Sequence, residues 1–117
     1  MKKHRLVVLS LSLFVGVATC AVALADQRAD AAGRGAKLFA DTSLGANGKS
    51  CSSCHGDGSV WAGKARFPKV AVGGMHTLDQ TIQTCIANAL GARPLAWDDP
   101  RITALAVFVD AAYAPKK

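Results

Sequence analysis

The chain has 117 residues, a formal net charge of +6, and hydrophobic residues at half of its positions. This length suits one small domain. The basic residues do not gather into the concentrated positive face that nucleic-acid binding requires, so we expect no nucleic-acid partner.

Residues 1–25 have the pattern of a secretory signal. A basic start precedes an apolar run, which closes with Ala23-Leu24-Ala25, a small-x-small form that signal peptidases cut after. An uncleaved anchor is the alternative, because about 20 apolar residues can span a bilayer. We predict cleavage after Ala25, export to the periplasm, and no stable membrane insertion of the remaining domain, residues 26–117.

The predicted mature domain is small and mildly basic. It has 92 residues, with 11 Lys or Arg against eight Asp, a net charge of about +3. A domain of this size has a marginal core and often needs a covalent or metal cross-link. Its three cysteines are Cys51, Cys54 and Cys85, an odd number for an oxidising compartment in which thiols usually pair.

Helix formers begin the domain and turn residues follow. The stretch from Asp30 predicts a helix in which Gly33 and Gly35 would let another helix approach closely. Residues 41–50 are rich in turn formers and predict a loop. Residues 56–76 contain five glycines and predict a long irregular segment, which is unusual in a small domain unless something large fills the space beneath it.

Two further helices have clear start signals. Thr77 and Gln80 match a capping box and predict a helix from Leu78 to Leu90 that stops at Gly91. Its apolar stripe is Leu78, Ile82, Cys85, Ile86 and Ala89, so Cys85 should point inward. Asp99 as N-cap and Pro100 at the first position predict the last helix. Its inward face is Ile102, Leu105, Val109 and Tyr113. No segment shows sustained strand alternation, and the predicted fold is all-α.

The segment Cys51-Ser52-Ser53-Cys54-His55 has the C-x-x-C-H spacing of covalent haem attachment. Two thiols on one helical turn can reach the two vinyl groups of a haem, and the following imidazole then lies under the iron. A thioredoxin-like pair would need a βαβ unit, and a zinc site a second ligand pair. A simple disulfide leaves His55 unexplained. We predict one haem c attached through Cys51 and Cys54, with His55 as the proximal iron ligand.

Three residues are candidates for the distal iron ligand. Cys85 is preferred because it lies on the inward stripe and is otherwise an unexplained thiol. Met75 is the alternative, since thioether ligation is common in electron carriers and raises the reduction potential. His76 is a weaker candidate. The same residues also have structural interpretations, Cys85 as a small buried hydrophobe and Met75 as a loop residue that fills a gap.

The chain resembles two related groups of proteins. "GRGAKLF" before "CSSCHG", with "LAVFV" in the last helix, is similar to class I c-type cytochromes, which implies N- and C-terminal helices that cross over one haem. The stretch from Thr77 to Val109 resembles the cytochrome domain of thiosulfate dehydrogenases and of the A subunit of the Sox sulfur-oxidation system. In that domain a helix cysteine is the distal haem ligand, which implies this role for Cys85. Asn88 stands where this family often has Arg.

These features predict an exported monohaem cytochrome that transfers single electrons between redox proteins, with no catalytic residue of its own. The alternative is a haem subunit of an enzyme that oxidises thiosulfate or a related sulfur anion, with a Cys-ligated haem. One haem motif and Asn88 in place of Arg favour the carrier.

Overall fold

The structure is a computed structural model that describes the backbone of residues 2–115 and the side chains of residues 21–115. The chain divides after Asp30 into two units. Helix α1 (Lys2–Ala40) contributes to both, and its last ten residues belong to the second unit. Among the described residues, no helix is long and apolar enough to cross a membrane. Cleavage after Ala25 stays a prediction.

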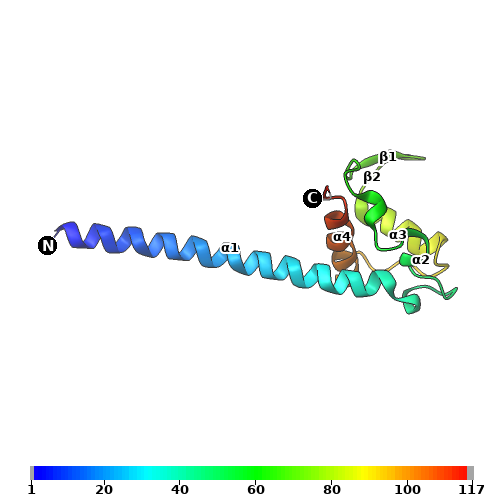
Figure 1. Ribbon diagram of the computed structural model, residues 1–117, viewed down its shortest axis with the longest axis horizontal. Coiled ribbons are helices and arrows are strands. Elements are labelled where there is room, and N and C mark those ends of the chain that lie inside the picture. Colours follow the sequence, from blue (N-terminus) through cyan, green and yellow to red (C-terminus); the bar gives the residue numbers. More distant parts are fainter. Residues whose placement is uncertain (1, 116–117) are drawn as a thin grey trace. The chain divides into compact units, whose positions relative to one another are not determined.

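The second unit is mostly helical, as predicted (Figure 1). After α1 its elements are η1 (Thr42–Leu44), α2 (Ser52–His55), η2 (Ser59–Trp61), β1 (Lys69–Ala71), β2 (Gly74–His76), α3 (Leu78–Asn88) and α4 (Pro100–Ala112). The two strands pair antiparallel, with Val70 opposite Met75. Sequence reasoning missed this hairpin because three-residue strands are too short to show an alternating pattern.

The N-terminal and C-terminal helices of this unit contact each other through Gly35 of α1. A Cβ atom at Gly35 would collide with the carbonyl oxygen of Ala104 and lie 2.6 Å from the Cβ of Phe108, both on α4. The two backbones therefore meet with no side chain between them, which confirms both the crossing of the terminal helices and the expectation for Gly35. The expectation for Gly33 is wrong, since a Cβ there has no atom within 4 Å.

Helix α3 starts as its sequence predicts. The Thr77 hydroxyl accepts a hydrogen bond from the Gln80 backbone N–H (3.3 Å), and the Gln80 side chain accepts one from the Thr77 N–H (2.8 Å). The helix ends at Asn88, two residues before the predicted end. Gly91 then takes a positive φ of 64°, and the Ala92 N–H donates to the Ile86 carbonyl (3.1 Å), which closes the helix end.

Helix α4 also starts at the predicted residues. The Asp99 carboxylate accepts from the Arg101 N–H (2.9 Å), and Pro100 occupies the first turn. Hydrogen bonds from the Arg101 side chain, and then its backbone N–H, lower the pKa of Asp99 from 3.8 to about 2. All four residues of the predicted inward face are buried. The core cluster is Phe39, Leu44, Ile82, Ile86, Leu90, Ile102, Leu105, Val109 and Tyr113.

Buried Gln83, which is only 6% exposed, fixes the loop between α3 and α4. Its amide nitrogen donates to the Leu95 carbonyl (2.5 Å), and its amide oxygen accepts from the Leu95 N–H (2.9 Å). One side chain thus satisfies both backbone groups of Leu95, as a neighbouring strand would. The loop is held against α3 without regular secondary structure.

Candidate functional site

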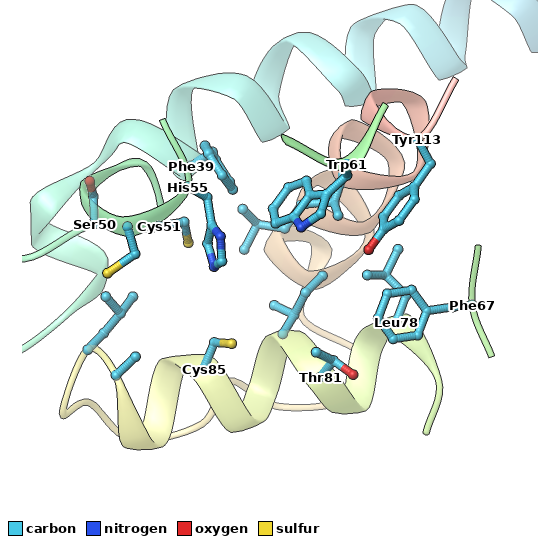
Figure 2. Close-up of a pocket in the computed structure, with 16 residues that line it drawn as sticks. Phe39, Ser50, Cys51, His55, Trp61, Phe67, Leu78, Thr81, Cys85 and Tyr113 are labelled. Carbon is cyan, nitrogen blue, oxygen red and sulfur yellow. The ribbon is translucent and has the colours of Figure 1, made fainter. Parts of the chain in front are cut away.

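The second unit contains a cavity with a volume of about 190 Å³ that opens partly to solvent. Figure 2 shows its sixteen lining residues. They are Phe39, Ser50, Cys51, Cys54, His55, Trp61, Phe67, Leu78, Thr81, Ile82, Cys85, Ala89, Leu90, Leu105, Val109 and Tyr113. None of these is Lys, Arg, Asp or Glu, and most are apolar.

The C-x-x-C-H segment forms a single helical turn at one side of the cavity. The His55 N–H donates to the Cys51 carbonyl (3.1 Å), which is the hydrogen bond of an α-helical turn. Buried Ser50 precedes the turn, and its N–H is capped by the Ser53 hydroxyl (3.0 Å). As a result Cys51, Cys54 and His55 all line the same cavity.

Aromatic side chains support the His55 ring. Trp61 lies beside it, with ring centroids 4.8 Å apart. Trp61 also stacks on Tyr113 at 5.8 Å with an interplanar angle of 10°, and meets the Phe39 ring edge-on at 5.9 Å. The imidazole is therefore held between α2 and a set of packed rings from η2, α1 and the end of α4.

Helix α3 forms the opposite side of the cavity and carries Cys85. Figure 2 shows the Cys85 side chain in the space between α3 and the segment that carries His55 and Cys51. Burial raises the pKa of the Cys85 thiol, and nearby Cys54 raises it further. Burial is also the main cause of a raised pKa at Cys51, with Cys85 and then Cys54 adding to it. In the polypeptide alone the raised pKa values favour the thiol form of Cys51 and Cys85, and coordination to a metal ion would favour a thiolate.

The other candidate ligands lie outside the cavity lining. Met75 is on β2 and is 63% exposed. The Nε2 atom of His76 lies 3.2 Å from the Val72 carbonyl oxygen of the same hairpin. Asn88 and Trp97 line a separate surface groove along α3 and the following loop.

The residues of the cavity fit a haem. They supply two thiols and an imidazole on one turn, a facing thiol on α3, and apolar surroundings for a large flat ring. Within the part of the chain that the structure describes, no group of three or more His, Cys, Asp or Glu could hold a metal ion directly. The thiols of Cys51, Cys54 and Cys85 and the imidazole of His55 thus line a cavity and do not form a ready-made metal site.

Some of these residues were not predicted as site residues. Thr81 lies one turn before Cys85, so extending the inward stripe by the i, i+4 rule would have found it. Tyr113 was predicted as a core residue of the last helix, and its place in the cavity depends on how α4 packs. Ser50 has no sequence signal that separates it from other loop serines.

A small helical unit with crossing terminal helices and this cavity has the architecture of a cytochrome c domain. Residues 34–113 match the family described as "SoxA/TsdA, cytochrome c domain", and the chain belongs to this family. This confirms the resemblance found in the sequence.

One curated relative is the L-cysteine S-thiosulfotransferase subunit SoxA of Rhodovulum sulfidophilum, which is 30% identical over 78 residues. The match covers 63% of this chain and 27% of that protein, so the chain corresponds to about a quarter of the relative's length. No solved structure has a significant match.

Proposed function

We propose that this chain is a monohaem subunit of a sulfur-compound-oxidising system. In this proposal the haem c is bound through Cys51 and Cys54, with His55 as the proximal and Cys85 as the distal iron ligand. The observation that carries the proposal is that Cys85 faces the His55 side of an apolar cavity that Cys51 and Cys54 also line. Membership of the SoxA/TsdA family supports it. This reverses the preference for an independent carrier that the sequence alone suggested.

The bound haem would supply a one-electron redox centre. The residues of the chain then have separate tasks. Cys51 and Cys54 form thioether bonds, and the aromatic set around Trp61 holds the His55 ring in place. Apolar side chains of α3 and α4 that line the cavity would pack against the haem ring. Cys85 is preferred over Met75, because Met75 is exposed on the hairpin and does not line the cavity.

The cavity also bears on what this subunit does with a sulfur anion. None of its sixteen described lining residues is Lys or Arg, and Asn88 lies in the groove on another face of α3. Among the described residues that line the cavity, none therefore supplies a cation to balance the charge of a thiosulfate-like anion near Cys85. We propose that this chain transfers electrons, while a partner protein contributes the binding of the anion. The second candidate function is a carrier that works between periplasmic redox proteins. The lack of Lys and Arg among the described lining residues favours this candidate as well.

The proposed location of this work is the periplasm, with residues 1–25 acting as a cleaved export signal. The apolar run and the Ala23-Leu24-Ala25 end support this proposal.

The first test is the mass of the secreted protein from cells that mature c-type cytochromes. We expect the mass of residues 26–117 plus one haem. A mass equal to the bare polypeptide would refute the haem proposal, and a mass that retains residues 1–25 would refute cleavage.

The second test compares Cys85→Met with Met75→Leu in the haem-loaded protein. Cys85→Met should change the near-infrared and electron paramagnetic resonance spectra and raise the reduction potential, because a thioether replaces a thiolate. Met75→Leu is the matched control and should leave both unchanged. The opposite pattern would assign the distal position to Met75.

The third test separates the two candidate functions. Thiosulfate should reduce the purified protein only when its partner proteins are present. Reduction by thiosulfate without a partner would show that the chain binds the anion itself. No reduction with any sulfur-oxidising partner, together with rapid electron exchange with other cytochromes, would favour the independent carrier.

A further inference from the structure

Lys69 lies beside two aromatic rings that line the cavity, those of Tyr113 and Phe67. It is the first residue of β1 and is half-buried. Its ammonium group donates a hydrogen bond to the Tyr113 hydroxyl (2.8 Å). The same nitrogen lies 4.3 Å from the centre of the Tyr113 ring and 4.6 Å from that of Phe67, and both rings line the cavity.

This arrangement is closely packed and offers several hydrogen-bond donors. Tyr113 is only 5% exposed, stacks on Trp61, and meets the Phe67 ring edge-on at 6.1 Å. An ammonium group has three protons, and the bond to the phenol uses one of them. The phenol oxygen accepts that bond, so its own O–H proton can be donated elsewhere. A positive charge and up to three available donor protons therefore lie close to the rings that line this part of the cavity.

Haem has the complementary chemistry on one edge. Its two vinyl groups lie on adjacent pyrroles, and its two propionates lie on the other two pyrroles. If the vinyl groups bond to Cys51 and Cys54, the propionates leave from the opposite edge of the ring. In Figure 2, Cys51 lies at one end of the cavity, while Tyr113 and Phe67 lie at the other end. An ionised carboxylate beside apolar walls is costly unless a cation and hydrogen-bond donors balance it.

We propose that Lys69 and Tyr113 bind a haem propionate, with Lys69 supplying the charge and Tyr113 a second donor. The proposal rests on the haem attachment proposed above and adds two residues to it. Neither has a motif that reveals this role in the sequence. Arg66, three residues earlier, pairs with Asp110 through contacts of 3.0 and 3.1 Å and is committed to that ion pair.

The test uses the secreted, haem-loaded protein and its Lys69→Met, Lys69→Arg and Tyr113→Phe variants. The control is Lys64→Met, which removes the same charge from an exposed residue. Two quantities are measured: the propionate bending band in the resonance Raman spectrum, which responds to hydrogen bonds at the carboxylate, and the reduction potential.

Lys69→Met should shift the band and lower the potential. The potential falls because a cation near the haem disfavours the additional positive charge of the oxidised iron, so its loss favours oxidation. Lys69→Arg should keep the potential close to that of the wild type, and Tyr113→Phe should shift the band with a smaller change in potential. Lys64→Met should change neither quantity.

Three results would overturn the proposal. The first is a haem-loaded Lys69→Met protein with an unchanged band and potential. The second is an equal effect of Lys64→Met. The third is a Lys69→Arg variant that shows the full change of Lys69→Met, which would indicate a purely structural tie between β1 and α4. If Lys69→Met does not accumulate, an unshifted band in Tyr113→Phe refutes the proposal. A wild-type mass without haem would instead refute the proposed function, so the two failures are distinguishable.

Discussion

Replacing Gly35 with Ala tests whether direct contact between the backbones of α1 and α4 holds this domain together. The added methyl group would collide with the Ala104 carbonyl oxygen and lie 2.6 Å from the Cβ of Phe108. A backbone oxygen cannot turn aside as a flexible side chain can, so the two helices must separate.

The magnitude follows from two opposing effects. Forcing extra atoms into a packed contact costs about 1–3 kcal/mol, and collision with backbone places this variant near the upper value. Alanine favours a helix over glycine by about 1 kcal/mol, which offsets part of the cost. The net loss in the free energy of unfolding is therefore about 2 kcal/mol, which lowers the melting temperature by about 8–16 °C for a domain of this size.

Gly33→Ala is the matched control, two residues away on the same helix. Its Cβ meets no atom within 4 Å, so only the gain in helix preference remains. We expect it to be more stable than wild type by up to about 1 kcal/mol. Urea unfolding followed by far-ultraviolet circular dichroism measures both variants. If Gly35→Ala is as stable as the wild type, or if both variants lose the same stability, the proposed helix contact is wrong.

Three further predictions concern the N-caps of α3 and α4 and the loop between these two helices. Asp99→Asn keeps a good N-cap residue but removes its charge. Because folding lowers the pKa of Asp99 to about 2 from 3.8, its stabilising effect is complete above about pH 4 and is lost as the pH falls through about 2. Urea unfolding should find the variant less stable than wild type at neutral pH and equal to it below pH ~2; a constant difference would contradict this. Gln83→Ala leaves both backbone groups of Leu95 without their partner and should cost about 2–3 kcal/mol in the same assay. Thr77→Ala removes the cap of α3 and should cost about 1 kcal/mol, whereas Thr84→Ala, within the helix, should cost less.

Local signals in the sequence predicted the starts of α3 and α4 and singled out the C-x-x-C-H segment. Capping depends on residues within three or four positions of each other, so Thr77 with Gln80, and Asp99 with Pro100, identified both helix starts. The buried face of α4 followed from helical spacing alone. The C-x-x-C-H segment is similarly local, since one helical turn brings Cys51, Cys54 and His55 to the lining of one cavity.

Contacts between distant segments decided the remaining features. The sequence gives no reason to distinguish Gly33 from Gly35. Only the position of α4 shows that Gly35, and not Gly33, lies against that helix. Cys85 and Met75 were both candidates until packing placed Cys85 in the cavity and left Met75 exposed. Lys69 and Tyr113 are 44 residues apart, and their hydrogen bond joins β1 to the C-cap of α4. Residues far apart in the chain become neighbours only when the core forms, and spacing rules for single helices or strands do not describe that event.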